Sequence, residues 1–243
     1  MARYSAFLEV ADDGLCMAHI LELPGCIARA PTQAEALRQL PTAIRNYHDW
    51  LRWHGEAAPP AEEPVEIAIA DTSVGFGPFH PGDAAALFAP DRQPVTPDEV
   101  DYHLRLLSYS RADLLALVRD LTDPVLDWQP DAQSFSIRRL LRHIGNAEEW
   151  YVSRIAPPET LPPEWEHDED MSSMDFLEME RRTAEARLRR LTEAERSEVF
   201  YPQHWTRRAE EPWTARKVMR RFLEHEREHT AQIRQMLELY RGK

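Results

Sequence analysis

The chain opens with alternating apolar and polar residues, the pattern of a half-buried β-strand. The apolar positions fall on Tyr4, Ala6, Leu8 and Val10. Asp12-Asp13-Gly14 then supplies a hairpin turn before a second apolar stretch over residues 15–21. The pattern predicts two antiparallel strands.

A helix and a further strand follow in the sequence. Thr32 with Glu35 forms a capping-box pattern, and apolar residues then recur at helical spacing, which predicts a helix over 33–53 with a possible kink at Pro41. Residues 65–70 predict one more short strand. One helix cannot cover both faces of the resulting sheet, so this α+β module needs a further surface to complete its core.

The pattern changes to long stretches of 3.6-residue period after Pro97. Four helices are predicted, over residues 98–121, 137–155, from Ser172 or Ser173 to 191, and 215–240. Four such helices in one segment indicate an all-α four-helix bundle. Its connections exceed simple hairpin lengths, which leaves room for at least one crossover.

Glycine and proline are concentrated between these two regions. We therefore divide the chain into an α+β module over 1–72, a Pro/Gly-rich linker over 73–97 and a helical bundle over 98–243. Apolar residues make up 43% of the chain, which is enough for packed cores.

The charge balance limits the classes of partner. Lys and Arg number 29 against 42 Asp and Glu, a formal net charge of −13, so we expect neither nucleic acid nor membrane as partner. The first residues lack a secretory signal, and no apolar run is long enough to span a bilayer. We expect a cytoplasmic protein whose two cysteines, Cys16 and Cys26, remain thiols.

The first module resembles the HicB-like antitoxin family. The likeness covers residues 3–70 and rests on Tyr4 to Val10, Asp13-Gly14, Ala18, Leu23-Pro24-Gly25-Cys26, Ala28, Thr32-x-x-Glu35-Ala36 and Ala43-Ile44. The resemblance implies a small α+β fold that binds a protein partner of the toxin type. The DNA-binding segment usual in that family is replaced here by the longer helical region.

Histidines lie on the apolar stripe of the last predicted helix. His225 and His229 are four residues apart and therefore neighbours on one helix face, so both imidazoles can reach one metal ion. His143 lies on the inward face of the second helix of the bundle and can supply a third ligand. Coordination would satisfy nitrogen atoms that a dry core otherwise leaves unbonded.

The same letters permit a second interpretation. His225-Glu226-Arg227-Glu228-His229 matches both the H-E-x-x-H motif of zincin proteases and its reverse. Gln235 stands where a metzincin needs its third histidine, and few residues remain for the downstream glutamate of other zincins. The third protease ligand is therefore missing, and we disfavour a protease.

The helical region resembles the DinB-like superfamily of damage-inducible metalloproteins. The likeness covers 98–242 and rests on Phe135-Ser136-Ile137-Arg138-x-Leu140-Leu141-x-His143-x-x-x-Ala147-Glu148-x-Trp150-Tyr151, Trp213-Thr214-x-Arg216 and His225-x-x-x-His229-x-x-Gln232-Ile233. It implies a four-helix bundle with a crossover, often dimeric. It also implies a zinc, nickel or other divalent ion held by His143, His225 and His229. Some members resemble thiol-dependent transferases and others metal-dependent hydrolases.

These patterns lead to one functional prediction and one alternative. Three imidazoles leave a coordination position at which a water or thiol has a lowered pKa, so we expect a metal-dependent transferase or hydrolase acting on a small molecule. A transferase would take its thiolate from a low-molecular-weight cosubstrate, and Glu148 is the candidate catalytic base. His103 is a reserve ligand. The alternative is a non-enzymatic, partner-binding or regulatory protein of toxin-antitoxin origin with a structural or vestigial metal site.

Overall fold

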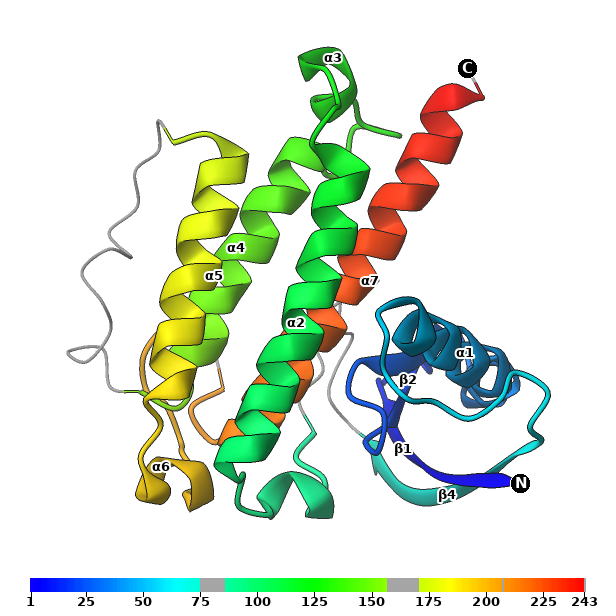
Figure 1. Cartoon of the computed structure of the whole chain (residues 1–243), viewed down its shortest axis with the longest axis vertical. Coiled ribbons are helices and arrows are strands. Elements are labelled where there is room, and N and C mark those ends of the chain that lie inside the picture. Colours follow the sequence, from blue (N-terminus) through cyan, green and yellow to red (C-terminus); the bar gives the residue numbers. More distant parts are fainter. Residues whose placement is uncertain (75–85, 157–170, 207, 243) are drawn as a thin grey trace. The chain divides into compact units, whose positions relative to one another are not determined.

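The computed structural model describes residues 1–74, 86–156, 171–206 and 208–242 (Figure 1). The chain divides into two compact units, Met1–Asp91 and Arg92–Lys243. The first is α+β and the second is helical, which confirms the predicted fold class.

The described residues of unit 1 form a four-stranded mixed sheet with one α-helix, and a short 3-10 helix, η1, follows at Ala89–Arg92. Its elements are β1 (Ala2–Val10), β2 (Cys16–Ile20), β3 (Cys26–Ala30), α1 (Gln33–Trp53) and β4 (Val65–Val74). The strand order is β3-β2-β1-β4, with β1 antiparallel to β2 and parallel to β4. The predicted hairpin turn between β1 and β2 is present, and Gly14 adopts there the positive φ of 89° that a side chain disfavours.

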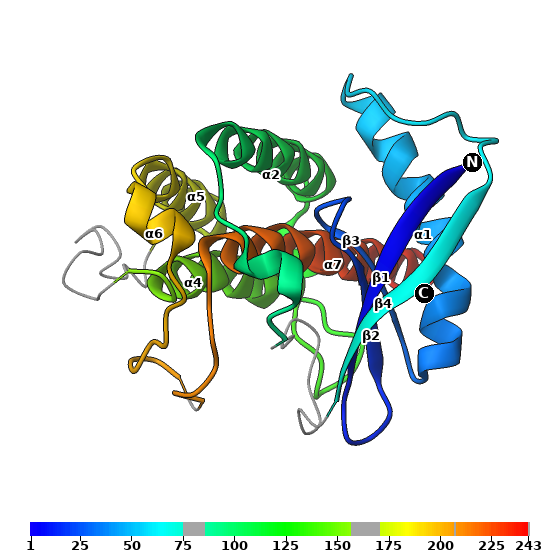
Figure 2. The ribbon, with the colours of Figure 1, turned by 90° about the horizontal axis from the view of Figure 1, so that it is seen from below.

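Helix α1 covers one face of the sheet (Figure 2). Its N-cap is Thr32, whose side chain accepts a hydrogen bond from the Glu35 amide, and it runs unbroken through Pro41 to the predicted end. The Tyr4 hydroxyl lies 2.9 Å from Nε2 of His48, so the face that carries Tyr4, Ala6 and Leu8 packs under the helix. The strand alternation of the sequence therefore placed these side chains correctly.

The opposite face of the sheet carries Phe7, which packs against Ala86 and Phe88. The buried carboxylate of Glu9 accepts a hydrogen bond from the Ala86 amide. Ala86 and Phe88 fall in the stretch 73–97 that the sequence predicts as a linker. Residues 75–85 of that stretch lie outside the described residues. The segment around Phe88 thus provides part of the second cover that one helix cannot give.

The described residues of unit 2 form four long helices and two short ones. They are α2 (Pro97–Val118), α3 (Asp123–Leu126), α4 (Ile137–Ser153), α5 (Ser173–Arg189), α6 (Glu193–Ser197) and α7 (Ala215–Arg241). Each long helix begins at a Ser or Thr whose side chain caps it: Thr96, Ser136, Ser172 and Thr214. Helix α2 ends three residues before its predicted end at 121, because Thr122 and Pro124 already begin α3.

The long helices do not pack in sequence order. Helix α2 packs mainly on α5 and α7, and α4 also packs mainly on α5 and α7. Helices α2 and α4 are therefore diagonal neighbours, as are α5 and α7, and the connections between them cross the bundle. The predicted crossover is present, and the apolar core between the helices includes Leu114, Leu140, Leu141, Ile144, Leu177, Ile233 and Leu237.

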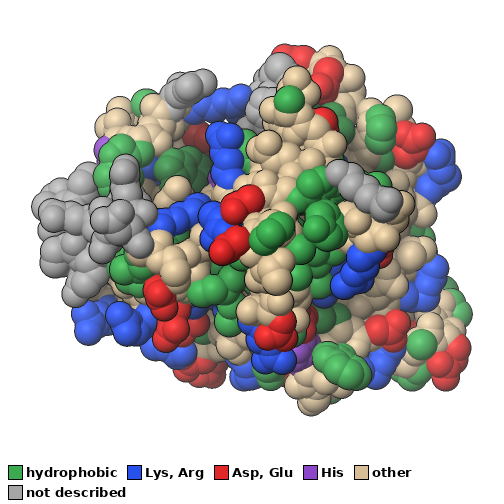
Figure 3. Space-filling model, turned by 90° about the horizontal axis from the view of Figure 1, so that it is seen from above, with side chains coloured by type: hydrophobic (Ala, Val, Ile, Leu, Met, Phe, Trp, Pro, Cys, Tyr) green, Lys and Arg blue, Asp and Glu red, His purple; other side chains and the backbone are tan. Residues whose placement is uncertain are grey.

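The surface carries charges of both signs. On the face drawn in Figure 3, basic and acidic side chains are interspersed rather than gathered by sign. None of the helices in the described ranges is long and apolar enough to cross a membrane.

Candidate metal centre

The three predicted histidines meet between α4 and α7. Nε2 of His225 lies 3.1 Å from Nε2 of His143 and 3.1 Å from Nε2 of His229. One ligand atom from each of the three lies within 4.8 Å of the others. The side chains that the sequence placed on two separate helices are thus brought to one point.

The site is enclosed on the α7 side and more open on the α4 side. His225 and His229 are each 4% exposed, whereas His143 is half-buried. The ring of Tyr151 lies edge-on to that of His225, with 5.8 Å between centroids, and Phe135 contacts His143. Aromatic side chains therefore flank the histidines.

The protonation of His229 is set by its neighbour on the next turn. Its Nδ1 lies 2.8 Å from Oε1 of Gln232. Because an amide oxygen accepts hydrogen bonds, Nδ1 carries the proton and Nε2 presents a lone pair toward His225. A hydrogen bond at the outer nitrogen is the usual way in which a protein fixes the tautomer of a metal-binding imidazole.

The environment favours a neutral imidazole at His225. Burial lowers the pKa of His225 well below its usual value, and positive charge on His229 or His143 would lower it further. A buried imidazole that stays neutral, with nitrogen atoms of two further imidazoles converging on it, is a donor set suited to a divalent cation. Two imidazole nitrogens bound to one tetrahedral zinc lie about 3.3 Å apart, close to the spacing observed here.

Glu148, predicted as the catalytic base, lies in a buried ion cluster. Its carboxylate pairs with the guanidinium groups of Arg111 and Arg181, and it is 2% exposed. A base must present its lone pair to a substrate, and guanidinium groups contact both oxygens of this carboxylate. The geometry favours a structural over a catalytic role for Glu148.

His103, the reserve ligand, and His204, in the loop before α7, are held in separate environments. His103 is buried on α2, where its Nδ1 donates to the Glu99 carbonyl at 2.9 Å, and it does not join the three-histidine cluster. His204 donates from Nε2 to the Ser153 carbonyl, and the carbonyl of Trp205 accepts from Trp150. These contacts tie the loop before α7 to the end of α4.

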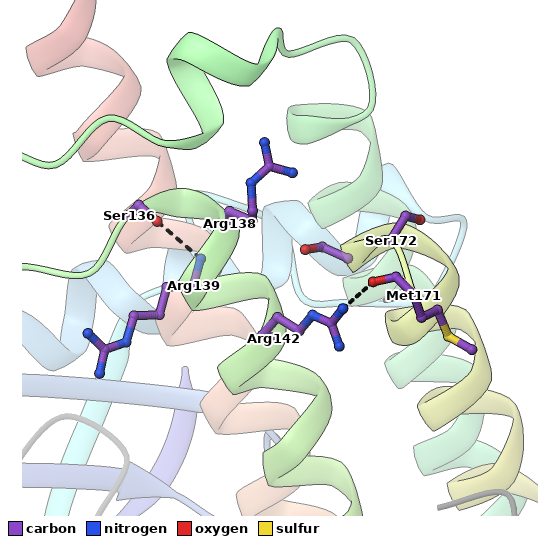
Figure 4. A pocket seen from close by; sticks show the side chains of 7 residues that line it. Ser136, Arg138, Arg139, Arg142, Met171 and Ser172 are labelled. Carbon is purple, nitrogen blue, oxygen red and sulfur yellow. Dashed lines mark hydrogen bonds between the residues drawn. The ribbon is translucent and has the colours of Figure 1, made fainter. Parts of the chain in front are cut away.

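A pocket of about 510 Å³ lies at the beginnings of α4 and α5. Figure 4 shows Arg142 reaching from α4 to the carbonyl oxygen of Met171. Arg138, also in its lining, pairs with Asp123 and Asp127. None of the three clustered histidines lines this pocket, so it is separate from the candidate metal centre.

The sequence interpretation missed Arg111, Arg181 and Glu226, which are buried beside Glu148. A local signal exists for Arg111, which stands in the stripe of Leu104, Leu107, Leu114 and Val118, at spacings of three and four. A charged residue in an apolar stripe is either a buried ion partner or a break in the core.

Comparison with known proteins gives one family and two similar proteins. The model of the DinB superfamily matches residues 106–233, which is more than half of the chain and includes all three histidines. The UPF0150 protein Ta0767 of Thermoplasma acidophilum is 33% identical over 57 residues, covering 24% of this chain and 83% of that protein.

One solved structure resembles this chain with lower sequence identity than the UPF0150 protein. YfiT from Bacillus subtilis, described as a probable metal-dependent hydrolase with an unusual four-helix bundle topology, aligns with a TM-score of 0.45 and 18% identity. The alignment covers 68% of this chain and 95% of YfiT. That likeness is too distant to carry a statement about this chain.

Proposed function

The chain belongs to the DinB superfamily, and from that premise we propose that it is a metal-dependent enzyme acting on a small molecule. His143, His225 and His229 are the proposed ligands. The observation that carries the proposal is the convergence of three Nε2 atoms, with 3.1 Å from His225 to each of the other two.

The donor set supports an open rather than a closed site. Structural zinc is normally held by four protein ligands, whereas catalytic zinc keeps three and leaves a position for water or substrate. Among the residues that the structure describes, the cluster has three members. When bound, a divalent ion in such a site supplies a Lewis acid that lowers the pKa of a water or thiol.

The side chains of this site would hold the metal ion and orient its ligands, and would not themselves react with the substrate. Gln232 keeps Nε2 of His229 unprotonated, burial keeps His225 neutral, and the half-buried side of His143 leaves an approach for a ligand. Tyr151 and Phe135 would exclude water from two sides of the rings. The chain thus provides three converging imidazole nitrogens, of which that of His229 is fixed by Gln232.

Two reaction classes fit this arrangement, hydrolysis and thiol-dependent transfer, with zinc or nickel as the ion. In a transferase the thiol would come from a small cosubstrate. Cys16 and Cys26 lie buried in unit 1, and burial raises the pKa of Cys16 to about 11, which keeps that thiol protonated at neutral pH.

Metal content of the purified protein tests the proposal. We expect near-stoichiometric zinc or nickel by elemental analysis of protein prepared without a histidine tag, and loss of that metal in the double variant His225→Ala, His229→Ala. His54→Ala, which removes an imidazole at the C-cap of α1, is the matched control and should retain the metal. A parent protein that takes up no zinc, nickel or manganese would refute the metal site.

We further propose that unit 1 is a partner-binding module of the HicB type. The chain is similar to a UPF0150 protein over 57 residues. The observed sheet with one α-helix also fits the small α+β fold that the HicB-like resemblance implies. The absence of metal in the test above would favour the non-enzymatic alternative, in which this module carries the function.

A further inference from the structure

Four buried charged side chains, one from each long helix of the bundle, contact one another. These residues, which we call the ion quartet, are Arg111 on α2, Glu148 on α4, Arg181 on α5 and Glu226 on α7. Their exposed fractions lie between 1% and 8%. Two positive and two negative charges give the quartet no net charge.

Every member of the quartet contacts both members of opposite charge. Arg111 donates from Nε to Oε2 of Glu226 at 2.9 Å, and its Nη2 pairs with Glu148. Arg181 donates from Nη2 to Oε1 of Glu148 and to Oε2 of Glu226, both at 2.8 Å. The quartet therefore joins all four helices through charge-assisted hydrogen bonds.

The two arginines also make a reciprocal pair of contacts to the backbone. Arg111 Nη1 donates to the Leu177 carbonyl on α5 at 2.6 Å, and Arg181 Nη1 donates to the Leu107 carbonyl on α2 at 2.9 Å. Each carbonyl belongs to the residue four positions before the opposite arginine. A planar guanidinium with donors in fixed directions can hold a carboxylate and a carbonyl together, so it fixes distance as well as direction.

The negative charges of the quartet lie on the helices that carry the three clustered histidines, and the positive charges lie on the other two helices. The two glutamates lie on α4 and α7, the helices that carry the three histidines, and the two arginines lie on α2 and α5, which carry none of the three. Glu226 directly follows His225, and Glu148 lies five residues after His143. The arginine-bearing helices thus hold the ligand-bearing helices at positions close to the ligands.

The physical effect of such a quartet is on geometry more than on stability. Removing charges from water offsets much of their mutual attraction, so apolar side chains of similar volume often stabilise a core as well or better. Rotation of α7 by one residue, about 100°, would however turn Glu226 away from both guanidinium groups. The quartet therefore penalises other rotations of α7, and those rotations would also move His225 and His229 away from His143.

We propose that Arg111, Glu148, Arg181 and Glu226 are positioning residues that hold α4 and α7 where the three histidine nitrogens converge. The inference rests on the proposed metal function, because its consequence is metal affinity. It gives Glu148 a role in building the site in place of the catalytic one.

An apolar replacement of the whole quartet separates positioning from stability. The variant Arg111→Met, Glu148→Leu, Arg181→Met, Glu226→Leu removes all four charges together, so that no member of the quartet is left without its partners. We expect it to fold with a melting temperature close to that of the parent. Its affinity for zinc, measured by competition with a chelating dye, should fall at least about tenfold, the effect typical of groups that orient ligands.

Two further measurements report geometry directly. Cobalt(II) gives an absorption spectrum that depends on the coordination geometry, and we expect it to differ between parent and variant. In the metal-free proteins, the nuclear Overhauser contact between the rings of His143 and His225, whose centroids are 4.9 Å apart, should be present in the parent and lost in the variant. This second readout needs no metal.

A matched control and a milder variant complete the design. Asp101→Leu with Arg189→Met removes an exposed ion pair between the same helices α2 and α5, and should leave zinc affinity unchanged. If the fourfold variant does not fold, Arg181→Lys keeps the charge but loses the planar fork, and should weaken zinc binding in a folded protein.

The outcomes distinguish this inference from the proposed function. A folded fourfold or Arg181→Lys variant that binds zinc like the parent, with the same cobalt spectrum and ring contact, would overturn the positioning role and leave the metal site intact. A parent that binds no metal would refute the proposed function. In that case the ring contact between His143 and His225 still decides whether the quartet positions the two helices.

Discussion

Glu180 on α5 is a buried carboxyl group that should make the stability of the bundle depend on pH. It is 0% exposed, and neither carboxylate oxygen has a hydrogen-bond partner among the described residues. Burial, together with the negative charges of Glu149 and Glu148, raises its pKa to about 8 from an ordinary value of 4.5. At neutral pH the folded protein therefore holds a proton that the unfolded chain releases.

The sign and size of the effect follow from linkage. Because the pKa is raised on folding, the contribution to stability is fully present below pH 4.5 and is lost as the pH rises toward 8. One pKa unit corresponds to about 1.4 kcal/mol, so the loss amounts to about 3 kcal/mol by pH 7 and at most about 5 kcal/mol above pH 8. That is a large fraction of the free energy of unfolding of a typical domain.

Urea unfolding at pH 5, 7 and 9 tests this reasoning. Glu180→Gln has nearly the shape of the protonated acid and does not titrate. Between pH 5 and pH 7 its free energy of unfolding should therefore rise by about 2.5 kcal/mol relative to that of the parent. Glu180→Met should behave similarly without a buried amide. Glu178→Gln, an exposed position on the same helix, is the control. Parallel pH profiles for parent and Glu180→Gln would refute the argument.

Three further predictions concern packing and the metal centre. Gly145→Ala should destabilise the bundle by about 1–3 kcal/mol in urea unfolding. The added Cβ would lie 2.5 Å from a ring carbon of Phe176 and force α4 and α5 apart. An unchanged midpoint of the urea transition would contradict this. Gln232→Ala should weaken zinc binding about tenfold in dye competition by freeing the His229 tautomer. Removal of bound metal by a chelator should lower the melting temperature, since an ion at 100 times its Kd adds about 2.7 kcal/mol; an equal temperature with and without chelator would speak against a bound ion.

The sequence predicted the helices well because their signals are local. Thr32 with Glu35 and the capping residues Ser136 and Thr214 mark helix starts that the structure reproduces. The three histidines were found for a similar reason. Their spacing places each on an apolar stripe, and in a bundle such stripes face one another.

The ion quartet was missed because its contacts join residues on four different helices. In any one helix, Arg181 or Glu226 reads as an ordinary charge, and only the partners on the other helices show that burial is possible. The second cover of the sheet was missed in the same way, since Phe88 lies in a Gly/Pro-rich stretch and gains its role only through Phe7. Contacts between distant segments carry no local pattern.

The neutrality of the ion quartet has a consequence for how the bundle folds. If α7 were undocked, Arg111 and Arg181 would share Glu148 alone and one positive charge would remain uncompensated; if α5 were undocked, one negative charge would remain. Each three-helix assembly thus buries an excess charge, at a cost of several kcal/mol, or stays open to water. The quartet therefore disfavours intermediates in which three of the four helices have docked, relative to the complete bundle.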